Sequence, residues 1–249
     1  MDLAAPWLAP LAPALGLAWG EWQAGCSVSD ALNRAGEAGA RSALTGPAWP
    51  RFVPQVALPA DEAYEAFIHR TGQVPTRDNL HDFFNGLVWL ALPAVKHRLN
   101  ALQVAEIARL GVGAVRGPAR DALTLFDESG ALLQAPLVLQ QALQGRDWRA
   151  LFITHRALWY EARLVIVGHA LLEKLASEPR KALTAQVLLA DPLALDAAGW
   201  AGKPFAPLPV LGVPGWWPAN ERPDFYDDAA VFRPARSLLW KGSARRCRS

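Results

Sequence analysis

Apolar residues at helical spacing are densest in the stretch that runs from residue 76 to residue 92. Intervals of three and four between them predict an amphipathic helix, and Pro93 ends it or begins the next one. Its apolar stripe consists of Leu80, Phe83, Phe84, Leu87, Val88 and Ala91. His81, Asp82 and Asn85 stand within about one turn of each other beside this stripe, so the segment combines core packing with polar chemistry.

Shorter patterns predict elements before and after this helix. A β-branched run at 163–167, followed by Gly168 and strong helix formers, predicts a strand, a turn and a helix; one continuous helix over 148–176 is the alternative. Residues 183–189 fit a strand or a helix. Further helices are predicted over 27–36, 61–70, 94–110 and 136–143, with an extended segment over 49–54.

A β-hairpin is predicted over 121–135. Two short apolar runs flank a turn that contains Gly130, which is the usual pattern of two antiparallel strands. Asp121, Asp127 and Glu128 frame this turn, and such carboxylates can bind Mg²⁺ or Ca²⁺. Asp, Ser and Gly are also ordinary turn residues, and we favour that simpler interpretation.

The two ends of the chain differ from its middle in composition. Residues 1–26 are rich in Pro and Trp, and we expect them to lie extended across the surface of the core. Residues 237–249 are dominated after Trp240 by Arg, Lys and Ser, which is typical of a solvated basic tail. Residues 27–236 contain no linker and no internal repeat, which indicates a single globular domain.

The segment 204–236 contains too many prolines and glycines to build a core of its own. It nevertheless carries large aromatic side chains that would form an unusual exposed patch in water. We therefore expect an irregular wrap that docks on the stripe around Leu80, Phe84 and Leu87. The complete pattern predicts an α+β fold: a mostly helical single domain with a small antiparallel β element and a long irregular C-terminal wrap.

The composition of the chain limits the kinds of binding partner that we expect for this protein. The 249 residues are 52% hydrophobic, enough for a sizeable core, and a net charge of +2 gives no reason to expect nucleic acid or an anionic membrane. Prolines interrupt the apolar N-terminal run and no Lys or Arg precedes Arg34, so neither a secretory signal nor a spanning helix is expected. We expect a cytoplasmic protein without a membrane partner; its oligomeric state stays open.

Familiar catalytic motifs are absent, and what remains is a loose set of polar residues in apolar surroundings. A divalent metal, the candidate cofactor, would use His81, His169 and Glu173, because imidazoles and carboxylates are its usual ligands. Alternatively, His81 acts as a general base, with Asp82 as its partner and Asn85 as a polar orienter. The simplest interpretation makes these groups structural: a buried His, held by a neighbouring Asp or Asn, fixes two helices in register.

The C-terminal wrap offers a second set of candidate residues. Trp216 and Trp217 could form a stacking platform for a small molecule, with Asn220, Asp227 and Asp228 as polar contacts beside it. A tryptophan pair bracketed by prolines more often buries such a wrap against the core.

Several longer strings resemble an uncharacterised bacterial family, domain-of-unknown-function family 3025, found mostly in proteobacteria. They are Pro75 to Asn85, Arg120 to Glu128, Gly168 to Lys174, Val213 to Asn220 and Phe225 to Pro234. The resemblance covers roughly residues 27–236, and only Ser129 departs from it, where Asn is expected. It implies a single-domain cytoplasmic protein and supplies no activity, cofactor or catalytic residue.

Two functions therefore stay open. The first is a metal-assisted or His-assisted hydrolase of a small or nucleotide-like substrate. The second is a non-catalytic binding or scaffold protein whose polar core residues only fix helix packing. The absence of a recognised catalytic motif favours the second slightly.

Overall fold

The computed structural model describes residues 1–40, 50–111 and 117–235. The predicted basic tail, 237–249, lies outside them. The helices are α1 (Ala12–Gln23), α2 (Val28–Ala40), α3 (Tyr64–Thr71), α4 (Leu80–Ala91), α5 (Pro93–Leu110), α6 (Pro118–Ser129), α7 (Leu137–Gln144), α8 (His169–Ser177) and α9 (Ala197–Ala201). Short helical turns are η1 (Pro6–Leu11), η2 (Gln55–Ala57), η3 (Ala150–Thr154), η4 (Arg156–Glu161), η5 (Val210–Gly212), η6 (Pro218–Glu221) and η7 (Pro223–Asp227).

Two small sheets accompany the helices. Strands β1 (Arg51–Pro54) and β2 (Gln73–Thr76) form a parallel pair. The larger sheet has the order β4-β3-β5-β6, and its strands are β3 (Gly130–Gln134), β4 (Arg163–Ile166), β5 (Thr184–Leu188) and β6 (Phe205–Pro209). Strand β3 runs antiparallel to β4 and parallel to β5, and β6 runs antiparallel to β5. The predicted class, a mostly helical α+β domain, is confirmed.

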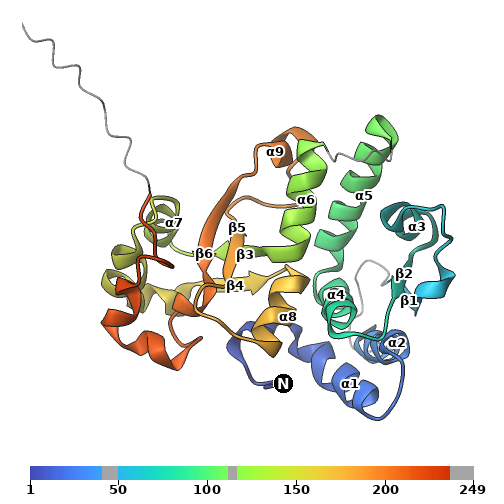
Figure 1. The fold of residues 1–249 in the computed structure, drawn as a ribbon, viewed down its shortest axis with the longest axis horizontal. Coiled ribbons are helices and arrows are strands. Elements are labelled where there is room, and N and C mark those ends of the chain that lie inside the picture. Colours follow the sequence, from blue (N-terminus) through green and yellow to red (C-terminus); the bar gives the residue numbers. More distant parts are fainter. Residues whose placement is uncertain (41–49, 112–116, 236–249) are drawn as a thin grey trace, which may run out of the picture.

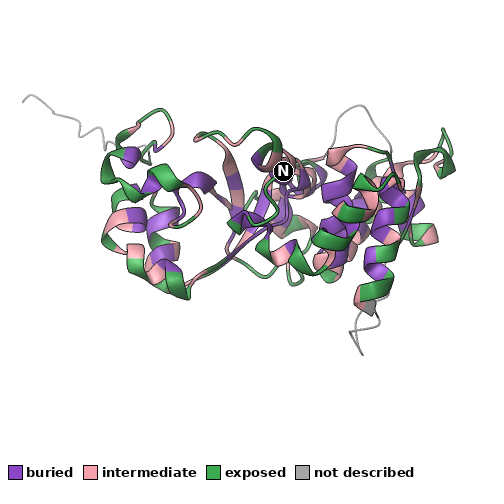
Figure 2. Cartoon of the chain, turned by 90° about the horizontal axis from the view of Figure 1, so that it is seen from below, coloured by how far each residue is buried: buried purple, intermediate pink, exposed green. Residues whose placement is uncertain are grey.

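The sheet divides the molecule into two helical parts. Figure 1 shows α6, α8 and then α4 and α5 on one side of the sheet, and α7 with the C-terminal turns on the other. One cluster of buried apolar residues runs through both parts, from Ala5 to Phe232, and appears in purple in Figure 2. No described helix combines the length and apolar character needed to cross a membrane.

Several predicted elements are confirmed. The helix with the dense apolar stripe is α4, and Pro93 begins α5 directly after it. The strand, turn and helix predicted around Gly168 are β4 and α8, so the continuous-helix alternative over 148–176 is wrong. The undecided segment 183–189 forms β5.

The hairpin predicted over 121–135 is wrong, because its first half is helix α6. Ala119, Ala122, Leu123 and Phe126 are all buried, and their spacing is helical. Pro118 stands in the first turn of α6, where no amide hydrogen is needed. Gly130 therefore makes no hairpin turn, and β3 pairs with the distant strand β4.

The prediction that 1–26 is extended is also wrong. This segment forms η1 and α1, and it contributes Trp7, Leu8, Leu11 and Leu15 to the buried core. Pro6 and Pro13 stand in the first turns of η1 and α1, where they interrupt no hydrogen-bond ladder, and Pro10 lies inside the short turn η1.

The C-terminal wrap docks at a different place from the one predicted. Tyr226 stacks on Phe152 at 5.0 Å between ring centroids, and the centroid of Trp216 lies 6.2 Å from that of Trp7. The wrap thus packs on η3 and η1, and Figure 1 shows its orange and red segments far from α4. The stripe of α4 is covered instead by α1, α2 and α8. Phe83, for example, stacks on Trp22 at 5.0 Å.

Asn220 provides a test of how the wrap is held. Its side chain is fully buried, and its Nδ2 donates to the main-chain oxygens of Leu211 at 2.8 Å and Val213 at 2.7 Å. Asn220→Asp would turn a carboxylate oxygen towards these two carbonyl oxygens, so we expect a loss of about 1–3 kcal/mol of unfolding free energy.

Urea denaturation measures this loss. The matched control is Asn79→Asp, because Asn79 caps α4 through its side-chain oxygen and Asp caps a helix equally well. Equal stability of the Asn220→Asp protein and the parent would contradict a structural role for Asn220.

Candidate functional site

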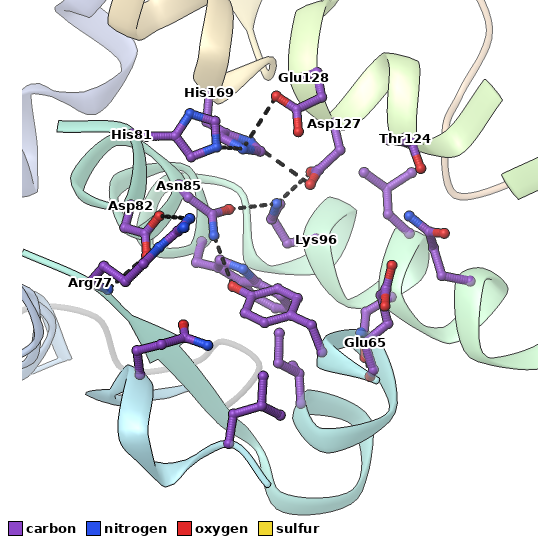
Figure 3. A pocket seen from close by; sticks show the side chains of 18 residues that line it. Glu65, Arg77, His81, Asp82, Asn85, Lys96, Thr124, Asp127, Glu128 and His169 are labelled. Atoms are coloured by element: carbon purple, nitrogen blue, oxygen red, sulfur yellow. Dashed lines mark hydrogen bonds and ion pairs between the residues drawn. The ribbon is translucent and has the colours of Figure 1, made fainter. Parts of the chain in front are cut away.

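A cavity of about 330 Å³ lies among α3, α4, α5, α6 and α8. Figure 3 shows that polar side chains from different helices converge on it. Six of these polar residues form the centre of the candidate site, and all of them line the cavity: His81, Asn85, Lys96, Asp127, Glu128 and His169.

Two imidazoles meet at one end of this cavity. His81 Nε2 lies 3.0 Å from His169 Nε2, and the two rings are nearly perpendicular. His169 is buried, whereas about a third of the His81 side chain is exposed. The pair therefore joins the first turn of α4 to the first residue of α8, with one imidazole open to solvent.

Local sequence fixes the start of α4. The side chain of Asn79 caps the helix by accepting a hydrogen bond from the Asp82 amide at 2.8 Å. Asp78 accepts from the amide of Val28 at 2.7 Å, which ties α4 to α2. The first turn, which carries His81, is therefore held from both sides.

A close backbone approach fixes the start of α8. The amides of Val167 and Gly168 both donate to the carbonyl oxygen of Gly130 at 2.9 Å. A Cβ atom at Gly168 would lie 2.4 Å from Ser129 Cα and 2.6 Å from the carbonyl oxygen of Glu128. Only glycine allows this contact, and the contact sets His169 beside the end of α6.

Three carboxylates lie beside the imidazole pair. Glu173 Oε2 lies 2.9 Å from His81 Nδ1, on the side of the ring that faces away from His169. Glu128 Oε2 lies 3.7 Å from His169 Nε2, and Asp127 Oδ2 lies 3.8 Å from His169 Nδ1. One ligand atom from each of His81, Glu128 and His169 lies within 4.8 Å of the others.

The protons of the two rings cannot satisfy all of these contacts. Burial lowers the pKa of His169 to about 4, so its ring is neutral near pH 7 and carries one N–H. If His81 is neutral and donates from Nδ1 to Glu173, the contact between the rings needs the His169 proton on Nε2. His169 Nδ1 is then a bare lone pair that faces the Asp127 carboxylate, and this buried atom has no hydrogen-bond partner in the described part of the chain.

A positive charge between the two Nε2 atoms removes this conflict. A second proton on His81 is one such charge, and a metal ion is the other. With a metal ion both rings keep their proton on Nδ1, where the carboxylates of Glu173 and Asp127 can accept it.

A buried polar chain continues from this end along the cavity. Lys96 forms an ion pair with Asp127 and donates to Asn85 Oδ1 at 2.9 Å. Asn85 Nδ2 in turn donates to the hydroxyl of Tyr64 at 3.1 Å. Although burial opposes it, the charge of Lys96 holds the pKa of Asp127 below its usual value. Burial raises the pKa of Glu128.

Asp82 serves a different purpose from the predicted one. Its carboxylate accepts from Arg77 Nε at 3.1 Å, Nη2 at 2.9 Å and the Arg77 amide at 2.7 Å. It is thus paired with Arg77 at the edge of the cavity, and no hydrogen bond joins it to His81 within the described residues.

The second predicted set does not join the site. Trp216, Trp217, Asn220, Asp227 and Asp228 do not line the cavity. Asn220 Nδ2 donates to two main-chain oxygens of the wrap, and Asp228 pairs with Lys181 at 3.1 Å. This second set of candidate residues therefore lies outside the His81 cavity.

One family model matches the chain. It is described as "Protein of unknown function (DUF3025)", and it matches residues 50–194 and 186–236. The chain belongs to this family. Comparisons with curated proteins and with solved structures found no match. The resemblance noted from the sequence is thereby confirmed, and the matched part of this DUF3025 protein contains the whole cavity.

Sequence reasoning missed Asp127 and Glu128 as cavity residues. Both were interpreted as turn residues of a hairpin, because Gly130 follows them. The available signal was the helical spacing of Ala119, Ala122 and Phe126, which extends the segment to Ser129 as one helix.

Gly168→Ala tests the contact that positions His169. The added methyl group would meet backbone atoms of Ser129, which cannot rotate away, so we expect a loss of about 1–3 kcal/mol of unfolding free energy. The control is Gly20→Ala in α1, where a Cβ meets nothing within 4 Å and alanine should stabilise by up to about 1 kcal/mol. Urea denaturation compares the two, and an unchanged Gly168→Ala protein would show that α6 and α8 can separate at no cost.

Proposed function

We propose that this DUF3025 protein is a metal-dependent hydrolase whose divalent cation is held by His81, His169 and Glu128. The observation that carries the proposal is the 3.0 Å approach of two Nε2 atoms, together with a buried His169 Nδ1 that has no hydrogen-bond partner among the described residues. Buried polar atoms in proteins are nearly always hydrogen-bonded, so this exception calls for a reason.

The spacing of the three ligand atoms suits a zinc ion. Tetrahedral zinc with bonds of about 2.0–2.1 Å separates neighbouring ligand atoms by roughly 3.3 Å. The distances from His169 Nε2 are 3.0 Å to His81 Nε2 and 3.7 Å to Glu128 Oε2, on either side of that value. Two histidines and one glutamate are also a common set at catalytic zinc, where the fourth position is left for water or substrate.

The surroundings supply the partners that metal-bound histidines usually have. Such a histidine almost always donates its second N–H to a carboxylate, a carbonyl oxygen or water. Glu173 already lies at hydrogen-bond distance from His81 Nδ1, and Asp127 is nearest to His169 Nδ1. Lys96 holds Asp127 in place through their ion pair. In this proposal Glu173 orients a ligand and is not a ligand itself.

The chemistry assigned here is hydrolysis. A bound zinc ion polarises a carbonyl group and lowers the pKa of a bound water to about 7. The ammonium group of Lys96 and the hydroxyl group of Tyr64 line the same cavity, and both can donate hydrogen bonds to a carbonyl oxygen that gains negative charge. Asn85 binds both groups and so fixes their spacing.

The non-catalytic alternative predicts a closed core around His81. The cavity of about 330 Å³ and the partial exposure of His81 favour the enzyme instead. A site without metal, in which a second proton charges His81, remains the competing explanation of the short contact and is an outcome of the test below.

The test measures metal content and hydrolysis in the same full-length preparations. Protein stripped with a chelator and reloaded with zinc should retain about one zinc per chain, and it should hydrolyse activated esters and anilides only when loaded. His81→Ala, His169→Ala and the isosteric Glu128→Gln should each weaken zinc binding by tenfold or more. His69→Ala is the control, because His69 is exposed and does not line the cavity.

Zinc binding that survives both histidine substitutions would refute the site. If no zinc is retained while the parent hydrolyses the same substrates and His81→Ala does not, the metal-free His-assisted mechanism replaces it.

A further inference from the structure

Two amide side chains line the cavity on the helix that carries Lys96. Asn100 and Gln103 stand one turn apart on α5, so they share a face of that helix. Both are buried, with 7% of each residue exposed. Their position gives the cavity a wall of uncharged hydrogen-bonding groups.

Gln103 is the unusual member of this pair. Its Oε1 is buried and has no hydrogen-bond partner among the described residues. An unsatisfied buried acceptor costs about 1–3 kcal/mol, which is why few such atoms occur in folded proteins. Asn100, by contrast, is oriented by the hydrogen bond from its Nδ2 to the main-chain oxygen of Glu65 at 2.9 Å. The lining amide of Gln103 therefore offers an acceptor for a donor that a ligand would bring.

The charges of the cavity indicate what kind of ligand fits. The basic side chains that line it are Arg77 and Lys96, and each is paired with a carboxylate. Glu65 and Glu128 also line it and add negative charge. Neither basic side chain is left over for a phosphate or a carboxylate, so apart from the proposed cation the cavity offers no free positive charge to an anionic ligand.

We propose that Gln103, with Asn100 beside it, is a subsite for an amide edge, meaning a C=O group next to an N–H group. Carboxamides, lactams and cyclic imides have such an edge. A glutamine side chain carries an acceptor oxygen and a donor nitrogen side by side, and so it can form two hydrogen bonds with this edge. The cavity of about 330 Å³ limits the ligand to a small molecule.

This subsite rests on the proposed function and narrows it to hydrolysis of small neutral amides. In that reaction the oxygen of water bonds to the carbonyl carbon and the C–N bond breaks. The nitrogen leaves with a proton from the water, and the products are a carboxylic acid and an amine. Tyr64 and Lys96 would stabilise the charge on the carbonyl oxygen while Gln103 holds the unreacted part of the substrate.

The experiment uses hydantoin, a small cyclic imide, as the probe for the amide edge. Calorimetry measures its binding to full-length protein, both stripped and zinc-loaded, with acetate and inorganic phosphate as comparison ligands. We expect hydantoin to bind both forms and to bind more tightly than either anion. Gln103→Leu should weaken hydantoin binding by about tenfold, because two hydrogen bonds are lost. It should leave the zinc content unchanged.

Gln141→Leu is the matched control, since Gln141 is exposed on α7 and outside the cavity. Hydantoin binding that is equal in the parent and Gln103→Leu, or weaker than phosphate binding, would overturn the subsite. Absence of hydantoin binding by protein that retains zinc would overturn the subsite and leave the metal site standing. If metal-stripped Gln103→Leu protein loses hydantoin binding, the subsite is supported even when the parent protein fails to bind zinc. The zinc site and the subsite can therefore fail separately.

Discussion

The close approach of α8 to the end of α6 is the constraint on which the site depends. Gly168 lies against the backbone of Glu128 and Ser129, and the two amides at 167 and 168 share the carbonyl oxygen of Gly130. This contact joins strand β4 to strand β3 and places the first residue of α8 beside the last turn of α6. Packing of α4 on α8 then brings His81 against His169 and Glu173 of α8. Sheet register and site geometry are thus fixed by the same few backbone atoms.

Two of the six buried side-chain atoms that lack a hydrogen-bond partner among the described residues belong to the cavity. They are His169 Nδ1 and Gln103 Oε1. The polar chain between them, from Asp127 through Lys96 and Asn85 to Tyr64, is by contrast well connected. A connected network of this kind is rigid, and it can hold unsatisfied groups in place for a ligand.

Local periodicity predicted much of the fold and only half of the site. The helices α4 and α5 were predicted from their apolar spacing, and α8 was predicted from the strong helix formers that follow Gly168. Two imidazoles were expected to come together from α4 and α8. The third group, Glu128, was missed because a glycine after a short apolar run favours a hairpin. The segment is helical instead, because the apolar residues of α6 form one buried helix face. Docking of the C-terminal wrap could not be predicted either, because the stripe of α4 was already covered by α1 and α2. Such competition between surfaces is a property of the whole chain and leaves no local signal.

The most direct test of the central claim, a cation between His81 and His169, is a crystal structure of the zinc-loaded protein with diffraction data on both sides of the zinc absorption edge. We predict one anomalous peak at about 2.0–2.2 Å from His81 Nε2, His169 Nε2 and a carboxylate oxygen of Glu128. We also predict that His169 Nδ1 then lies within hydrogen-bond distance of Asp127. Full zinc occupancy elsewhere, with the two Nε2 atoms still in direct contact, would contradict the claim.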